Sequence, residues 1–162
     1  MVTCELRRRP EWGSYDATGI EQLVEELHVK DDIIELGLVP YPFLHHVYKR
    51  CDIYVTPSYV ESFGHPLVEA MACGLPIVAS DLPVHREICG GAALYFHRFS
   101  HEKLADRVVE IALSPELGQK LRRRGGQRWP YFSWEKHLED LFGLAKTLVE
   151  GPLGTKRQDS LE

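Results

Sequence analysis

Long hydrophobic runs are missing from this sequence of 162 residues. No segment approaches about 18 uninterrupted apolar residues, the length that a membrane-spanning helix requires. Charged side chains also interrupt the first part of the chain, where a secretory signal would need an apolar stretch; they are Arg7, Arg8, Arg9, Glu11 and Asp16. We therefore expect no transmembrane segment and no secretory signal.

An excess of basic charge is missing as well. The chain carries 19 Lys and Arg residues against 24 Asp and Glu residues, which gives a formal net charge of -5. Proteins that bind nucleic acids or anionic membranes through electrostatics need the opposite balance. We expect no nucleic-acid partner and no attraction to an anionic membrane.

Closely spaced cysteines are also absent. The four cysteines form no Cys-x-x-Cys pair, which argues against a zinc ribbon and a thioredoxin-like motif; they are Cys4, Cys51, Cys73 and Cys89. We expect free thiols in a reducing compartment, and therefore a cytoplasmic protein.

No set of residues has the spacing of metal ligands. His45 and His46 are neighbours in sequence, and on a helix neighbouring side chains are expected to diverge. Neither has a further ligand at helical spacing, so we expect no metal site. His85 and Arg86 are expected on the surface of a short helix.

What the sequence does have is the composition of a globular domain. Hydrophobic residues make up 44% of the chain and charged residues 27%, ordinary values for a protein with a packed core. The length is close to that of one domain. We expect residues 1–150 to form one domain and the segment 151–162 to be a frayed tail.

Short β-rich runs alternate with helical patterns along the chain. The expected strands are residues 2–6, 33–39, 52–56, 76–80 and 92–96. Strands that alternate with helices form right-handed crossovers and a parallel sheet. The expected fold class is therefore α/β, a Rossmann-like parallel sheet of about five strands with helices on both faces.

Several residues mark the helix ends. Thr18 and Glu21 have capping-box spacing, and the face of Ile20, Leu23, Val24 and Leu27 is expected to be buried. Further helices are expected to start at Pro66, after Ser100, after Ser114 and after Ser133, with Gly74 as a left-handed C-cap. In the last helix, Trp134, Leu138, Leu141 and Phe142 are expected to pack in the core.

The loop after residues 52–56 is the best candidate for a site, because ligands bind at the carboxyl ends of parallel strands. Gly64 permits a positive φ just before the next helix, whose N-terminus is a natural phosphate site. Glu61 and Glu69 flank that N-terminus, and carboxylates accept hydrogen bonds from paired sugar or ribose hydroxyls. The pattern favours a ligand with both hydroxyls and phosphates.

A purely structural interpretation fits the same residues. Ser58 and Glu61 have capping-box spacing, and Glu69 complements the helix dipole. On residue chemistry alone, both interpretations stay open.

Glu61 and Glu69, with seven residues between them, resemble the EX7E motif of retaining glycosyltransferases with the GT-B fold, especially glycosyltransferase family four. The flanking sequence is similar too. It comprises residues 52–58 as the approach to the motif, 69–80 as the helix and next strand, 86–96 as the following segment, and Phe132-Ser133-Trp134 as the start of the last helix. The likeness covers about residues 20–149, and the ordered set is more specific than the motif alone.

The resemblance implies the donor-binding half of an enzyme that transfers a sugar from a nucleotide-diphospho-sugar to an acceptor. It assigns the ribose to Glu69 and the transferred sugar to Glu61, which makes Glu61 the catalytic residue. Backbone amides at Phe63, Gly64, His65 and Leu67 would face the diphosphate and sugar, and the nucleobase would rest near Val39. Enzymes of this type typically need no metal and no cofactor besides the donor.

The sequence also departs from the family's pattern. The family's C-terminal domain opens with a strand–helix unit that carries an Arg and a Lys for the diphosphate, whereas residues 2–6 resemble its second strand. That unit and the N-terminal acceptor-binding domain are expected to be missing, so the isolated chain is expected to be inactive. Two alternatives stay open: a non-catalytic nucleotide-sugar-binding module, or a fragment of a GT-B-fold nucleotide-sugar epimerase.

The missing strand would be central in a Rossmann sheet. An empty slot would leave backbone groups unpaired at about 1–3 kcal/mol each, more in total than a domain can bear. We expect residues 2–6 to take the central position, in the order 2-1-3-4-5. The alternative is a strand donated by another chain, which would produce a dimer.

Overall fold

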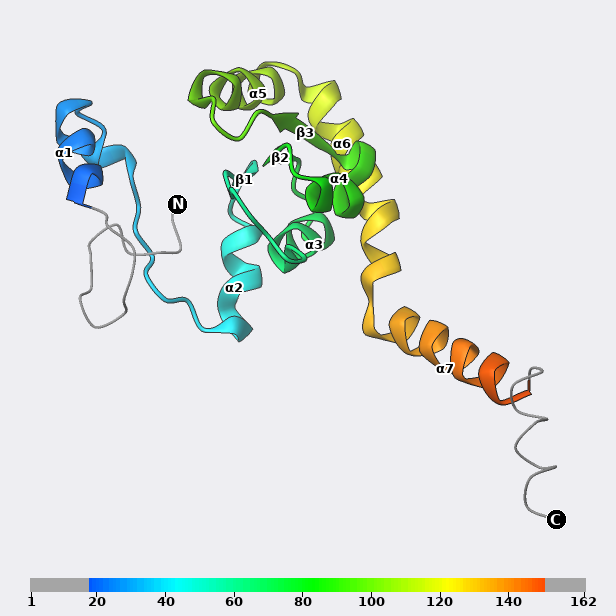
Figure 1. Cartoon of the computed structure of the whole chain (residues 1–162). Helices are drawn as coiled ribbons and strands as arrows, with labels where there is room; N and C mark the ends of the chain where they lie inside the picture. The colour runs from blue at the N-terminus through cyan, green and yellow to red at the C-terminus, as the bar shows by residue number, and fades with distance from the viewer. Residues whose placement is uncertain (1–17, 151–162) are drawn as a thin grey trace, which may run out of the picture. The chain divides into compact units, whose positions relative to one another are not determined.

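The structure is a computed structural model that describes residues 18–150. The chain divides into two compact units, Met1–Cys51 and Asp52–Glu162 (Figure 1). The expected single domain 1–150 includes residues of both units and stays a prediction. The expected strand at residues 2–6 and the expected tail at 151–162 lie outside the described residues.

The described part of the first unit is helical. It contains α1 (Thr18–Glu26), the short 3-10 helix η2 (Lys30–Asp32) and α2 (Tyr41–Tyr48). The strand predicted over residues 33–39 is wrong, because only Glu35 forms a β-bridge. Gly37 lies within the predicted run, and its φ of 61° takes the backbone out of the extended region at that point.

Helix α1 begins where the sequence predicts it, at Thr18. The buried face predicted for this helix is only partly present. Leu23 and Leu27 are 52% and 59% exposed, while Ile20 and Val24 are half-buried.

A parallel sheet forms the centre of the second unit. Its strands are β1 (Tyr54–Thr56), β2 (Ile77–Ser80) and β3 (Ala93–Phe96), in the order β1-β2-β3. Tyr54 pairs with Ile77, and Ile77 pairs with Ala93 on its other side. The predicted α/β class with a parallel sheet is confirmed, and the sheet has three strands within the described residues.

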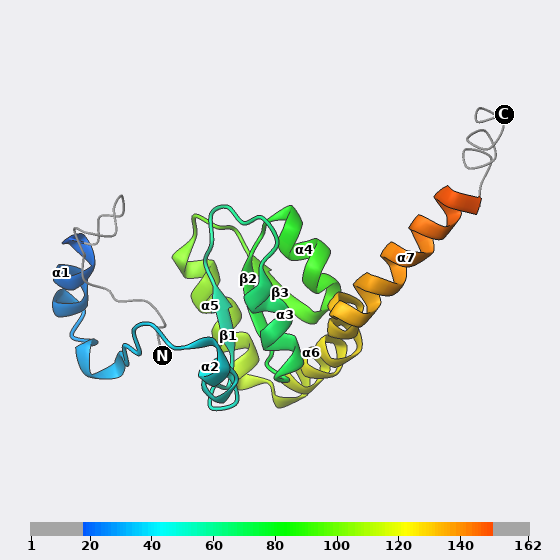
Figure 2. The same cartoon turned by 90° about the horizontal axis from the view of Figure 1, so that it is seen from below.

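Helices connect the strands and cover the sheet. They are α3 (His65–Ala72), α4 (Pro83–Cys89), η3 (Gly90–Ala92), α5 (His101–Leu113), α6 (Pro115–Arg128), η4 (Trp129–Phe132) and α7 (Trp134–Glu150). Figures 1 and 2 show the sheet between α3 on one face and α5 on the other. Helices on both faces are what the sequence predicts for this fold class.

The helix ends follow the local sequence signals. The Ser100 hydroxyl accepts a hydrogen bond from the Lys103 amide at 3.2 Å and so caps α5. Ser114 caps α6 in the same way, by accepting from the Leu117 amide at 3.3 Å. Gly74 follows α3 with a φ of 74°, as predicted for a left-handed C-cap.

The hydrophobic core lies between the sheet and the helices that follow it. Val78 of β2, Phe96 of β3, Ile111 of α5 and Leu121 of α6 form one buried cluster. All four residues of β2 are buried, which is typical of a central strand covered on both faces.

Helix α7 departs from the expectation of core packing. Trp134 is 76% exposed and Phe142 is 68% exposed, and no residue of the helix is buried. Figures 1 and 2 show α7 leading away from the sheet, and its main contacts are with η4. The amphipathic pattern therefore identifies the helix correctly, but its apolar face packs against no core of the described residues.

Among the described residues, no helix combines the length and the apolar character that crossing a membrane would require.

Two neighbouring glycines of α6 allow a test of how closely this helix packs on α3. A Cβ on Gly125 would lie 3.2 Å from the Met71 Cγ, in the buried contact of α6 with α3, whereas a Cβ on Gly126 would meet nothing within 4 Å. We expect Gly125→Leu to lose about 1–3 kcal/mol of unfolding free energy through overpacking.

Gly126→Leu is the matched control, because the same change of residue in the same helix turn meets open space. It should raise the unfolding free energy by about 0.5–1 kcal/mol through helix propensity. Urea denaturation of both variants measures the difference. Similar free energies for the two would show that α6 does not pack closely on α3.

Candidate functional site

The loop after β1 is anchored to the carboxyl end of β2. The Ser80 hydroxyl donates to the Ser58 carbonyl at 2.6 Å, and the hydroxyls of Thr56 and Ser58 lie 3.1 Å apart. His85 secures the same strand end, with its Nδ1 2.9 Å from the Ser80 carbonyl oxygen. The loop therefore leaves the sheet in a fixed direction toward α3.

His85 corrects the sequence interpretation. It was expected on the surface of α4, but its side chain is only 1% exposed. The reason is the pair of contacts with Ser80, because a buried imidazole requires hydrogen-bond partners. Arg86 is exposed, as expected, and pairs with Asp81 at the end of β2.

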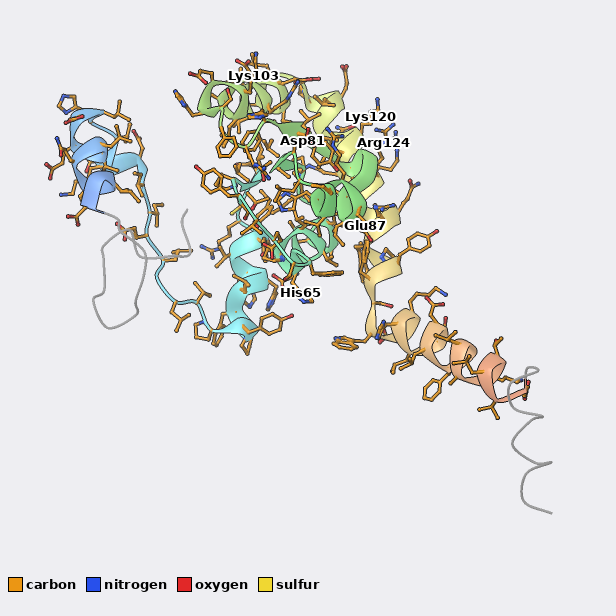
Figure 3. The ribbon with its side chains drawn as sticks, in the orientation of Figure 1. His65, Asp81, Glu87, Lys103, Lys120 and Arg124 are labelled. Carbon is orange, nitrogen blue, oxygen red and sulfur yellow. The ribbon has the colours of Figure 1, made fainter. Side chains whose placement is uncertain are left out.

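Gly64 makes the turn into α3. Its φ of 88° and ψ of 51° lie in the left-handed region, and it is buried. The Leu67 amide, which is predicted to face the diphosphate, donates instead to the Gly64 carbonyl at 2.9 Å, and the Leu67 side chain is 1% exposed. The prediction for Leu67 therefore needs correction, because this amide already has a backbone acceptor. His65 opens the helix, as Figure 3 shows, and its amide has no acceptor within the helix.

Glu61 and Glu69 both lie near Tyr54 of β1. Burial is the main cause that raises the pKa of Tyr54 to about 12, and the negative charges of Glu69 and Glu61 add to it, while a hydrogen bond with Thr56 opposes them. Both carboxylates are half-buried. The charges of both glutamates of the motif therefore act on the same tyrosine, the first residue of β1.

The Glu61 carboxylate also accepts a hydrogen bond from the Ser62 amide at 3.1 Å. This local contact is not the capping box with Ser58 that the structural interpretation invokes. Glu61 is held within the loop, next to the glycine turn, where its Cγ lies 3.5 Å from the position of a Cβ on Gly64.

An aromatic cluster supports the turn from outside the loop. The Phe63 ring lies 4.7 Å from the His65 ring and 6.0 Å from the Phe132 ring, in an edge-to-face arrangement with Phe132. Phe132 belongs to η4, at the end of the α6 segment. In the sequence, Phe132 is only part of the family likeness, and no local pattern indicates its contact with Phe63.

Val39 is the one predicted site residue of the first unit. It is half-buried and precedes α2. The remaining predicted residues, from Glu61 to Glu69, all lie in the second unit around β1 and α3.

The metal prediction needs one correction. The rings of His45 and His46 do not diverge, because their centroids lie 3.8 Å apart. Across residues 18–150 there is no group of three or more His, Cys, Asp or Glu side chains that could hold a metal ion.

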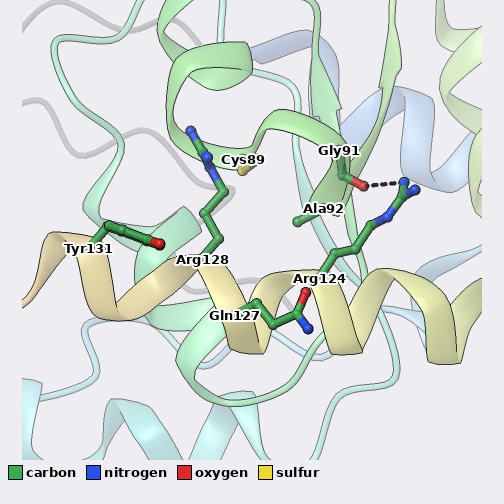
Figure 4. A pocket seen from close by; sticks show the side chains of 7 residues that line it. All are labelled: Cys89, Gly91, Ala92, Arg124, Gln127, Arg128 and Tyr131. Atoms are coloured by element: carbon green, nitrogen blue, oxygen red, sulfur yellow. Dashed lines mark hydrogen bonds between the residues drawn. The ribbon is translucent and has the colours of Figure 1, made fainter.

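A cavity of about 320 Å³ lies between α6 and the segment that joins α4 to β3. Figure 4 shows its walls, formed by Cys89, Gly91, Ala92, Arg124, Gln127, Arg128 and Tyr131. Arg124 donates to the Gly91 carbonyl and Arg128 to the carbonyls of Ile88 and Glu87. Arg128 thus satisfies two of the last carbonyls of α4 and Arg124 satisfies one of η3, so both guanidinium groups serve the packing of α6.

Cys89 in this cavity is an unreactive thiol. Burial raises its pKa to about 12, which the charge of Arg128 only partly offsets. Cys51 and Cys73 form no disulfide either, so the three cysteines that the structure describes are thiols, as predicted.

The fold has close counterparts among solved structures. Sucrose-phosphate synthase from Thermosynechococcus elongatus superimposes with a TM-score of 0.75 at 26% sequence identity, over 91% of this chain and 37% of that chain. The Anabaena protein HepE, solved in complex with UDP and glucose, gives a TM-score of 0.66 at 19% identity, over 77% of this chain and 35% of that chain. The second unit is thus part of a GT-B glycosyltransferase fold.

The sequence comparisons lead to the same family. The model of the family "Glycosyl transferases group 1" matches residues 13–128. The O-antigen chain mannosyltransferase B of Escherichia coli is 32% identical over 127 residues, which is 78% of this chain and 33% of the relative. The chain belongs to the group 1 glycosyl transferases, and it spans about a third of the length of that relative.

The glycine turn generates a prediction for stability. An alanine at position 64 would have to keep the left-handed φ of Gly64, and its Cβ would lie 3.0 Å from the Leu67 Cδ1. A left-handed backbone costs an ordinary residue about 1–2 kcal/mol. We expect Gly64→Ala to lower the unfolding free energy by more than this amount.

Gly74→Ala separates the two causes, because Gly74 has a φ of 74° and nothing within 4 Å of its Cβ position. It should lose only the cost of the backbone conformation. Equal losses for the two variants in chemical denaturation would mean that Leu67 yields freely and that the turn is not tightly packed.

Proposed function

We propose that this chain is the donor-binding part of a retaining glycosyltransferase that uses a nucleotide-diphospho-sugar. The observation that carries the proposal is the left-handed Gly64 turn into α3, with the half-buried carboxylates of Glu61 before it and Glu69 after it. The family membership supports the same reading. The relatives named above are glycosyltransferases and not epimerases, which favours transfer over epimerisation.

Each predicted residue has a role in this proposal. Glu69 accepts hydrogen bonds from the ribose hydroxyls, and Glu61 contacts the transferred sugar as the catalytic residue. The turn at Phe63, Gly64 and His65 offers backbone amides to the diphosphate, and Leu67 holds that turn through its bond to the Gly64 carbonyl. The positive end of α3 favours the charge of the diphosphate.

Three further parts of the proposal concern partners and location. Contact with the nucleobase is assigned to Val39 by the family likeness alone. The acceptor-binding domain and the remaining diphosphate contacts come from protein parts beyond this chain, so the chain alone transfers no sugar, since transfer needs both reactants in reacting geometry. A cytoplasmic location is supported by the free cysteines of the described residues.

Glu69→Gln tests the donor site. UDP is the first probe, because a protein that shares the fold was solved with UDP and glucose. We expect the variant to bind UDP about tenfold to a hundredfold more weakly, the loss for a charged hydrogen bond. Isothermal titration calorimetry on the full chain measures the two dissociation constants.

Glu116→Gln is the matched control, since Glu116 is an exposed carboxylate in the first turn of α6 and lies outside the predicted site. Its affinity for UDP should equal that of the parent. If Glu69→Gln binds UDP and GDP as tightly as the parent, the assignment of Glu69 to the ribose is wrong.

Chelation tests the expectation that the donor binds without a metal. The helix end supplies positive potential, and residues 18–150 contain no cluster of metal ligands. We expect the UDP affinity to be the same in EDTA and in magnesium or manganese. An affinity that falls on chelation and returns with either ion would contradict this part of the proposal.

A further inference from the structure

Two exposed aromatic side chains lie at the edge of the predicted site. Tyr59 follows β1 and Phe99 follows β3, and their rings stack with centroids 5.5 Å apart at an angle of 27°. Tyr59 is 64% exposed and Phe99 is 67% exposed. This pair is called the aromatic platform below.

Contacts from both loops fix the platform in place. Arg98 donates to the Tyr59 carbonyl at 3.3 Å, and its guanidinium lies 5.3 Å from the centroid of the Phe99 ring. The Phe99 amide donates to the Nδ1 of His97 at 3.4 Å, and these two rings are 5.5 Å apart. Because the rings are already held in place, a ligand that stacks on them binds with a smaller entropic cost for ordering the side chains.

The platform shares an edge of the sheet with Glu61. Figure 2 shows the loops after β1 and β3 at the same end of the strands. Tyr59 precedes Glu61 by two residues, so at most about 7 Å of extended backbone separates them. The bond from Ser80 to the Ser58 carbonyl fixes the adjoining backbone.

The chemistry of the platform fits a sugar ring. Because the two rings stack on each other, one face of each ring is turned to its partner and the other is left as apolar surface. Arg98 lies over the Phe99 ring, and together with His97 it places hydrogen-bonding groups beside the pair. A pyranose has the complementary arrangement, with a face of C–H groups and a rim of hydroxyls. A protein partner fits less well, because a stable protein interface buries about 800 Å² on each side, far more than two rings provide.

We propose that Tyr59 and Phe99 bind a sugar ring of the acceptor, next to the catalytic edge. This inference rests on the proposed function and extends it, because it assigns the recognition of a saccharide acceptor to residues of the donor-binding unit. The platform holds the apolar face of the ring, and Arg98 donates hydrogen bonds to its hydroxyls.

Aromatic NMR of the full chain tests the platform. A chain with ¹³C-labelled Tyr and Phe rings is titrated with methyl mannoside, methyl glucoside and sucrose to about 100 mM, because a few contacts give only millimolar affinity. We expect at least one saccharide to shift the Tyr59 and Phe99 signals. Tyr59→Ala and Phe99→Ala should each weaken its binding about two- to tenfold, and Phe99→Tyr should retain it.

Tyr131→Ala is the matched control, because Tyr131 is 69% exposed and lies outside the platform. It should leave saccharide affinity unchanged. The proposal is overturned if no saccharide shifts the platform signals, or if Tyr131→Ala weakens binding as much as the platform variants do. It is also overturned if dilution changes the same signals without saccharide, since a second copy of the chain would then cover the platform.

UDP affinity separates this inference from the proposed function. Neither platform variant should change it. UDP binding without saccharide binding would overturn the platform alone. Saccharide binding without UDP binding would support a saccharide site at the platform and overturn the donor-site proposal.

Discussion

Strand β2 lies between β1 and β3 with every side chain buried, and its last residue, Ser80, donates a hydrogen bond to the Ser58 carbonyl. This one bond joins the buried centre of the sheet to the loop that carries Glu61. Because Ser80 also contacts the buried His85, the strand end has its polar groups satisfied from both sides. The direction of the loop, and with it the positions of Glu61 and Tyr59, depends on this anchor.

The glycine turn depends on packing from two directions. From the first turn of α3, Leu67 fills the space where a side chain on Gly64 would lie. From the distant η4, Phe132 packs edge-to-face on Phe63, which also contacts His65. The N-terminus of α3 is therefore placed by contacts on both sides, which suits a site that must hold a charged ligand in one geometry.

Local signals in the sequence predicted the features that local chemistry decides. Ser100 and Ser114 cap their helices as expected, and Gly64 and Gly74 have the positive φ angles for which glycine is suited. The three strands of the described sheet also follow their predicted runs within one or two residues. The likeness to a family correctly indicated the GT-B fold and the group 1 glycosyl transferases.

Other features depend on contacts between distant residues, which no local pattern contains. The contact of Phe63 with Phe132, the burial of His85 and the stacking of Tyr59 on Phe99 are of this kind. The apolar periodicity of α7 also predicted more burial than the structure shows. An apolar helix face indicates that the helix needs a partner surface, but it does not indicate where that surface lies. At residues 33–39, the positive φ of Gly37 interrupts the extended backbone that the strand-forming side chains predict.

The α6 segment has a consequence for the order in which the chain folds. Arg122 reaches back to the Asp52 carbonyl across 70 residues of sequence, and Phe132 closes on Phe63 from a similar separation. Contacts so far apart along the chain form late, because the intervening loop must close first. During synthesis, β1 and the start of α3 leave the ribosome well before the residues that support them. The site is therefore completed only when translation has passed Phe132, and a nascent chain that stops earlier carries both glutamates without the support for their loop.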